Sequence, residues 1–326
     1  MVPEPNTHSL LKPHEVSDLP SVKDAGFALL KGREVRDIGY DDSGIEYRER
    51  QTLKRIGIVG GIWRYPVKSM CGERLSAATM TPHGLAGDRE WALRETAYGG
   101  IVSARTWPAM LQLRAAWIDD PLSDAGGARV RIEFPDGATI SIDAAAPEDP
   151  AASRALSAFL GREVRLERVR REPITAAERE AILRGDALPP ARDFFDEDVI
   201  HLIATGTLAH LRALAGGISD FDPRRFRANI IIDTGAETGG FIEDGWLDGI
   251  LETGEGEATA RIVGMRPALR CAITTHPQGE LPHDPAILRT AWQFHQAYAG
   301  IFAAVGAEGV IRMGDPVYLE RNGNRS

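Results

Sequence analysis

Two cysteines are the strongest candidates for a nucleophile or a soft metal ligand in this chain of 326 residues. Cys71 and Cys271 are too few for a four-thiolate metal site or a disulfide framework, so either would act as a thiolate. Arg270 precedes Cys271, and an adjacent guanidinium favours the thiolate form. Taken alone, however, the segment after Cys271 is typical of a strand in which the thiol is a buried apolar group.

Three cationic residues could together bind an anion. Lys68 is followed by Ser69, which adds a hydroxyl donor, and Arg89 and Arg227 could each hold a phosphate through two parallel hydrogen bonds. Considered one by one, Lys68 and Arg227 are more typical of solvated surface positions. Residue type alone therefore favours a surface role, and further evidence is needed to favour binding.

Polar turns add further candidates. Thr205 and Thr207 lie in a strand-to-helix turn, where Thr207 is placed to cap the helix, and both could face an anion at its amino terminus. Glu243 and Asp244 precede Trp246, and Asp244 could donate a proton. A structural role in that turn is the simpler interpretation of the two carboxylates.

Several common catalytic sites are excluded by direct search. The sequence contains no Gly-x-Ser-x-Gly elbow, Walker loop, His-Glu-x-x-His helix or Gly-x-Gly-x-x-Gly turn. His276 and His283 share a proline-rich loop, but no third ligand follows at a useful spacing, so we expect a solvated loop there.

The elements that must position these residues divide the chain into three parts. Residues 1–52 lack sustained periodicity and are expected to form an extended arm. Residues 53–185 contain short β-type runs, a hairpin over 129–143 and a helix over 151–160 that ends at Gly161. Residues 186–326 mix α and β, with strands over 199–205 and 226–233 and helices over 207–215 and 285–299. The predicted fold class is α+β.

Charge and hydropathy limit the kinds of partner that the protein is expected to have. The net charge of -9 opposes attraction to phosphate polymers, so we expect no nucleic-acid partner. The longest apolar run, 298–307, is broken by Gly300 and Gly306 and is far shorter than the ~20 residues of a membrane span. Because the amino terminus also lacks a secretory pattern, we expect a cytoplasmic protein without membrane association.

Seven short motifs, in order from about residue 55 to 320, resemble those of the MOSC family, named for the carboxy-terminal domain of molybdenum cofactor sulfurases. Each motif alone would be weak evidence, whereas seven in the right order strongly favour the family. The motifs are YPVKS (65–69), GLAGDREW (84–91), ARTWP (104–108), FRANI (226–230), EDGW (243–246), RCAITT (270–275) and GDPV (314–317).

The resemblance implies a β-rich MOSC N-terminal domain over 53–185 and a β-barrel-like MOSC domain over 186–326, which enclose one molybdopterin between them. By similarity to the mitochondrial amidoxime-reducing component, Cys271 would bind molybdenum directly. Asp244, the candidate proton donor, joins Cys271 as a predicted catalytic residue. The predicted cofactor-binding residues are Lys68, Ser69, Arg89, Thr205, Thr207, Arg227, Asn229 and Arg270.

The function implied is molybdenum-dependent reduction of an N-hydroxylated or N-oxide small molecule. Electrons would come from a separate ferredoxin-like protein or flavoprotein reductase, because the chain has no cluster of cysteines. Two alternatives remain open. One is sulfur transfer, with a persulfide on Cys271 delivered by a separate pyridoxal-phosphate-dependent desulfurase, and the other is non-catalytic binding of the molybdenum cofactor.

Two departures from the family pattern bear on this choice. Ala268 stands where many relatives have a second cysteine, which makes sulfur transfer less attractive than reduction. Cys71 is one residue later than the corresponding thiol of many relatives. Alternation along an extended segment would then turn its side chain to the opposite face.

Overall fold

The computed structural model describes residues 53–123, 127–168, 175, 177–178, 180–181, 200–235, 239–254 and 259–321. The predicted arm, residues 1–52, lies outside the described residues.

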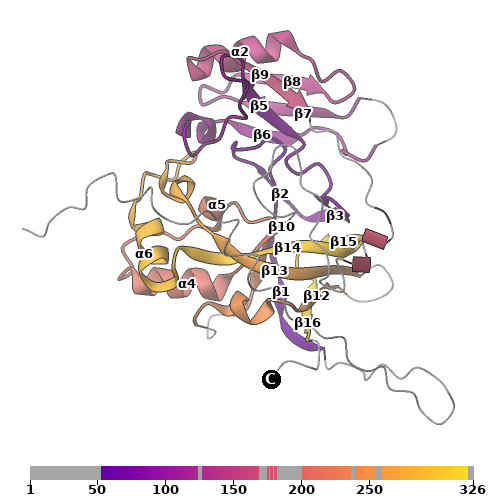
Figure 1. Ribbon diagram of the computed structural model, residues 1–326, viewed down its shortest axis with the longest axis vertical. Helices are drawn as coiled ribbons and strands as arrows, with labels where there is room; N and C mark the ends of the chain where they lie inside the picture. Colours follow the sequence, from indigo (N-terminus) through magenta and orange to yellow (C-terminus); the bar gives the residue numbers. More distant parts are fainter. Residues whose placement is uncertain are drawn as a thin grey trace, which may run out of the picture. The chain divides into compact units, whose positions relative to one another are not determined.

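A closed barrel of seven strands dominates the described chain. Around the barrel the order is β1 (Lys54–Arg64), β11 (Ile230–Asp233), β10 (Ile200–Ala204), β14 (Tyr298–Ala307), β13 (Ala260–Leu269), β12 (Ile250–Thr253) and β16 (Pro316–Glu320), which returns to β1. Only the pairing of β10 with β11 is parallel among these strands of the described chain. Figure 1 shows indigo β1 among the orange and yellow strands that follow it in the sequence by well over a hundred residues.

Alternation along β10 explains why its residues other than His201 are apolar. Leu202 and Ala204 belong to the cluster that fills the barrel, whereas Ile203 belongs to the cluster beneath the helices. Successive side chains of a strand point to opposite faces, so a strand covered on both faces is apolar at most of its positions. The predicted strand over 199–205 is confirmed at Ile200–Ala204.

Three helices cover one outer side of the barrel: α4 (Thr205–Leu214), α5 (Pro223–Phe226) and α6 (Ala286–His295). The chain passes from β10 through α4 and α5 to β11, which provides the crossover that a parallel pair requires. Figure 1 shows α4 and α6 together beside the barrel strands. Two 3₁₀ turns, η2 (Ile242–Trp246) and η3 (Ala272–Thr275), complete this region.

In this region the structure confirms a predicted helix and a predicted strand but shortens both, and a second predicted strand is absent. The helix expected over 285–299 ends at His295, because Gln296 and Ala297 both adopt positive φ and Tyr298 begins β14. The strand expected over 226–233 begins only at Ile230, after the one-turn helix α5. The segment after Cys271 is a 3₁₀ turn and not a strand.

The preceding region is β-rich, as predicted. β6 (Arg114–Trp117), β7 (Arg129–Glu133) and β8 (Thr139–Asp143) form an antiparallel sheet, and β5 (Trp91–Glu95) pairs with β9 (Val164–Arg168). The predicted hairpin over 129–143 and the predicted helix are both confirmed. The helix is α2 (Pro150–Leu160), with the Asp149 carboxylate accepting hydrogen bonds from two backbone amides at its start and Gly161 left-handed at its end.

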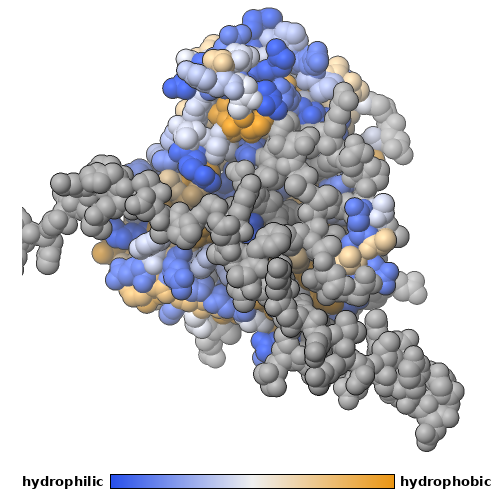
Figure 2. All heavy atoms as spheres, in the orientation of Figure 1, coloured by the Kyte–Doolittle hydropathy of each residue, from blue (hydrophilic) through white to orange (hydrophobic). Residues whose placement is uncertain are grey.

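The remaining elements are short. They are β2 (Glu73–Leu75), which pairs with β1; the sheet of β15 (Gly309–Arg312), β3 (Ala77–Thr81) and β4 (Gly84–Leu85); and the 3₁₀ turn η1 (Pro108–Gln112). Among the described helices, none is both long and apolar enough to cross a bilayer. On the face drawn in Figure 2, hydrophilic side chains cover most of the described surface and hydrophobic ones occupy smaller areas between them.

Candidate cofactor site

Two arginines and a tyrosine form the centre of the candidate site. The guanidinium carbon of Arg227 lies 4.3 Å from the centre of the Tyr65 ring, and that of Arg89 lies 5.4 Å from it. Arg89 also donates a hydrogen bond of 3.3 Å from Nη2 to the Arg227 carbonyl. Residues that follow β1 and β4 are therefore held against the turn before β11.

Arg227 is a buried cation with an unused hydrogen-bond donor. It is 8% exposed, and its Nη1 donates to the carbonyl of Met70. Its Nη2 is buried with no hydrogen-bond partner in the described part of the chain. Burial is the main cause of a lowered pKa at Arg227, and the positive charge of the neighbouring Arg89 lowers this pKa further. Because arginine stays protonated in proteins, an anion at this position would relieve an existing electrostatic cost.

Arg89 is held in place by partners on two sides. Its Nη1 donates to the Asp88 carboxylate at 2.6 Å and to the Asn229 side-chain oxygen at 2.9 Å. Asn229 is fully buried, and its oxygen also accepts the backbone N–H of His201 at 3.2 Å. Asn229 therefore acts in this structure as a residue that positions Arg89, while Arg89 presents the charge.

Three site candidates have unusual backbone conformations. Ser69, Arg89 and Arg227 have φ values of 69°, 48° and 54°, and they make up half of the six non-glycine residues with positive φ in the described chain. Such strain persists only where surrounding contacts enforce it, and it concentrates at functional sites. No sequence signal reveals this, since serine and arginine are not the residues that favour this region.

The segment from Lys68 to Met70 lies beside this cluster. The Lys68 backbone N–H donates to Trp91 O at 2.7 Å. Ser69 Oγ accepts the N–H of Ala104 at 3.0 Å, which leaves its O–H able to donate. Because Ser69 is left-handed, the segment does not alternate like a strand, and the expectation that alternation would place the Cys71 thiol on the opposite face has no basis in the structure.

A second network joins Arg270, and so its neighbour Cys271, to the same region. Arg270 Nη2 donates to Phe226 O at 2.8 Å, one residue before Arg227. Arg270 Nη1 lies 3.4 Å from Nε2 of His201, whose Nδ1 is 3.1 Å from the same Phe226 oxygen. Burial, and then Arg270, hold the pKa of His201 well below its usual value, so the imidazole is neutral. Cys271 is a half-buried free thiol at the start of η3.

The side chains of Thr205 and Thr207 form hydrogen bonds with residues outside the arginine cluster. Thr205 Oγ1 donates to Asp233 at 3.1 Å, and Thr207 Oγ1 bonds to Glu243 and to Gly240 O. Helix α4 begins at Thr205 with Ala204 as its N-cap residue and no side-chain cap, so the expectation that Thr207 caps the helix was wrong. Their predicted contact with a cofactor remains a prediction.

The two carboxylates of η2, Glu243 and Asp244, differ in their exposure to solvent and in their hydrogen-bond partners. Asp244 accepts a hydrogen bond from Nε2 of His295 at 2.9 Å, and its side chain is 45% exposed. Glu243 is fully buried. Its carboxyl group accepts a hydrogen bond from the backbone N–H of Ala204 and forms a second hydrogen bond with the Thr207 hydroxyl. Within the described residues, Asp244 makes no hydrogen bond or ion pair with Cys271 or with the arginine cluster, so its catalytic role remains a prediction.

The described residues offer no metal site built from protein side chains alone. Nowhere in the described residues do three or more His, Cys, Asp or Glu side chains gather in a way that could hold a metal ion. A metal centre at Cys271 would therefore have to arrive with ligands of its own, as a molybdopterin dithiolene does.

Comparison with known proteins adds independent evidence. The model of the MOSC N-terminal beta barrel domain matches residues 56–163, and the model of the MOSC domain matches residues 189–318. No curated protein shows a significant match.

Solved structures show only distant similarity. The YUAD protein from Bacillus subtilis is 12% identical, with 83% of this chain and 100% of that chain covered and a TM-score of 0.43. YiiM from Geobacillus stearothermophilus is 21% identical, with 39% and 56% covered and a TM-score of 0.29. YiiM from Escherichia coli is 16% identical, with 41% and 60% covered and a TM-score of 0.28. The two domain models together span more than half of the sequence, and the chain therefore belongs to the MOSC family.

Proposed function

We propose that this protein binds a molybdopterin-type molybdenum cofactor and uses it to reduce N-hydroxylated or N-oxide small molecules. Membership of the MOSC family supports an association with the molybdenum cofactor in general. The observation that carries the proposal is Arg227, a buried cation with a donor that has no partner in the described chain and with Arg89 beside it.

The residues present suit the two ends of such a cofactor. A phosphate group requires fixed cationic donors, which Arg227 and Arg89 provide, and the Ser69 hydroxyl can add a neutral donor. A soft metal ion prefers a thiolate, and Cys271 is a free thiol that follows Arg270 in the sequence. The hydrogen bonds through Phe226 and His201 support a common location for these groups.

The cofactor would supply two-electron redox chemistry, and the protein's own side chains would bind and orient it. Arg227 would neutralise phosphate charge from a buried position. Asp88 and Asn229 would keep Arg89 aimed at the same group. Arg270 would stay fixed on Phe226 O and hold the chain next to Cys271 in place.

Proton and electron supply remain part of the proposal. Asp244 is proposed as a proton donor, and its hydrogen bond with His295 places a second proton-carrying group next to it. The 326 residues hold two cysteines, too few for an iron–sulfur cluster among them, and we propose a separate ferredoxin-like or flavoprotein reductase as the source of electrons.

Sulfur transfer is the competing proposal for the same thiol. Ala268, where many relatives have a second cysteine, is fully buried in β13 and offers no sulfur for a relay. This observation favours reduction over sulfur transfer.

The deciding experiment compares three proteins purified from a host that makes the cofactor: the unsubstituted chain, Cys271→Ala and Cys71→Ser. We expect molybdenum in the unsubstituted chain and in Cys71→Ser, with reduction of an amidoxime in the presence of a reductant. Cys271→Ala should lose this activity and change the molybdenum absorption spectrum, because a thiolate ligand is removed.

Two outcomes would redirect the proposal. Full activity of Cys271→Ala would show that this thiol is not the metal ligand. A chain without molybdenum but with a persulfide on Cys271, delivered by a desulfurase, would establish sulfur transfer instead.

A further inference from the structure

A pocket opens beside Cys71 and shares the Tyr65 ring with the arginine cluster. It is a shallow pocket that is open to solvent. Its lining does not include Cys271, Arg89 or Arg227. The ten lining residues are Trp63, Tyr65, Cys71, Gly72, Arg114, Arg224, Gln278, Gly279, Glu280 and Leu281.

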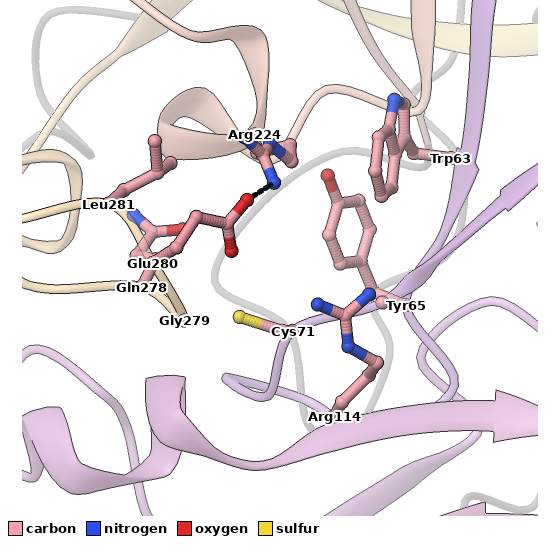
Figure 3. A pocket seen from close by; sticks show the side chains of 10 residues that line it. Trp63, Tyr65, Cys71, Arg114, Arg224, Gln278, Gly279, Glu280 and Leu281 are labelled. Atoms are coloured by element: carbon pink, nitrogen blue, oxygen red, sulfur yellow. Dashed lines mark hydrogen bonds and ion pairs between the residues drawn. The ribbon is translucent and has the colours of Figure 1, made fainter. Parts of the chain in front are cut away.

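Backbone pairing places a thiol and a guanidinium together in this pocket. Cys71 forms a parallel bridge with Arg114, through Cys71 N–H to Leu113 O at 2.9 Å and Ala115 N–H to Cys71 O at 2.8 Å. Residues paired across neighbouring strands project to the same face. Figure 3 shows the result: the Arg114 guanidinium stands beside the Cys71 sulfur and the Tyr65 ring.

The Arg114 side chain lines the pocket and makes no direct hydrogen bond or ion pair with another residue of the described chain, although its charge acts on Glu280. Its guanidinium can therefore donate two parallel hydrogen bonds to a carboxylate.

The opposite wall carries the opposite charge. Arg224 pairs with Asp222 at 2.7 Å and also with Glu280, so these three residues together carry one negative charge in excess. The hydrogen bond from Arg224 lowers the pKa of Glu280, which keeps the carboxylate ionised. Figure 3 shows one Glu280 oxygen on Arg224 and the other turned toward the middle of the pocket.

Between the two charged walls the pocket is apolar. The Trp63 and Tyr65 rings form one side, and Leu281 lies on the other (Figure 3). Aromatic rings accept both flat apolar groups and cations on their faces. A ligand that fits must therefore combine a carboxylate, a cationic group and an apolar body.

We infer that this pocket binds a zwitterionic small molecule of the α-amino-acid type with an aromatic side chain. Arg114 binds the carboxylate, Glu280 accepts from the ammonium group, and Trp63 and Tyr65 contact the ring. The pocket adjoins the proposed cofactor site at Tyr65, and its binding of this ligand is tested without reference to the cofactor.

Cys71 provides a reporter for occupancy of the pocket. Its thiol donates to Leu111 O at 3.1 Å and lines the cavity, and burial raises its pKa. The rate of alkylation by iodoacetamide at about pH 8.5 would be followed at Cys71 by peptide mass spectrometry, separately from Cys271. The full chain is used, with L-phenylalanine, 3-phenylpropanoate and phenethylamine as probes.

L-phenylalanine should slow the alkylation of Cys71 in a saturable manner. 3-Phenylpropanoate lacks the ammonium group and phenethylamine lacks the carboxylate, so each should bind about tenfold more weakly. Arg114→Gln and Glu280→Gln should each weaken protection by L-phenylalanine by a similar factor. Arg131→Gln changes an exposed arginine on the neighbouring strand β7 and serves as the matched control.

Three results would overturn the inference. They are no protection by L-phenylalanine, equal protection by 3-phenylpropanoate or phenethylamine, or an effect of Arg131→Gln as large as that of Arg114→Gln. Glu280 lies in a loop far along the chain from β6, so the two test variants do not share a folding defect. Molybdenum content is not part of the readout, so failure here is distinguishable from failure of the reductase proposal.

Discussion

The protonation of Glu243 gives the most quantitative prediction. Glu243 is 1% exposed, and burial raises its pKa to about 7 despite hydrogen bonds from Thr207 and from the Ala204 backbone. The hydrogen-bond pattern explains why the neutral acid fits. Thr207 has one hydroxyl hydrogen but lies near two acceptors, Gly240 O and the Glu243 carboxyl. A protonated Glu243 can donate to Thr207, which then donates to Gly240.

The sign and size of the effect follow from linkage. A pKa raised on folding stabilises the protein below the unfolded value of 4.5, and this contribution disappears as the pH rises toward about 7. The difference of about 2.5 pKa units, at about 1.4 kcal/mol each, corresponds to about 3 kcal/mol in the free energy of unfolding.

Glu243→Gln isolates this contribution, because the amide keeps the shape and can still donate to Thr207 and accept from Ala204. Urea unfolding of both proteins would be measured at intervals from about pH 4.5 to about pH 7.5. The variant should match the unsubstituted chain at the acidic end and exceed its free energy of unfolding by about 3 kcal/mol at the other.

Comparison between the two proteins removes the contribution of other titrating groups. Glu148→Gln, at an exposed position, is the control and should show no such trend. A difference between Glu243→Gln and the unsubstituted chain that stays constant with pH would refute the reasoning.

Three further predictions follow from single contacts. Arg227→Gln should lower cofactor occupancy about ten- to hundredfold, measured as molybdenum per chain, and unchanged occupancy would show that no anion binds there. Gly300→Ala should cost about 2 kcal/mol or more in urea unfolding, because its Cβ would lie 2.3 Å from Leu202 O. Gly137→Ala, with positive φ but open space, should cost only about 1 kcal/mol. Asp149→Ala should lower stability by about 1 kcal/mol through the loss of the α2 cap, and an unchanged melting temperature would contradict that role.

Local signals in the sequence determined the local elements. The hairpin over 129–143 follows from alternation around a Pro-Asp-Gly turn, and α2 follows from helical spacing that ends at Gly161. These features depend on neighbours within a few residues, so no knowledge of the rest of the chain is needed. The order of the seven motifs likewise identified the family from the sequence alone, and the domain models agree.

The closure of the barrel was decided by tertiary structure. β1 pairs with β11 and β16, which follow it by well over a hundred residues, and nothing in the alternation of β1 specifies those partners. The same holds for the turn at Arg227, whose left-handed backbone is fixed by α5 and by contacts with Met70 and Arg89. Pattern alone predicted a continuous strand there.

The chemistry of individual side chains divides in the same way. Arg89, Arg227 and Cys271 could be predicted as site residues from the sequence, because residue type and motif are visible in it. It could not show that Glu243 is the buried carboxylate and Asp244 the exposed one, or that Cys71 shares a pocket with Arg114. Burial, charge pairing and backbone strain arise from groups that meet only after the chain has folded, and these quantities set pKa and binding.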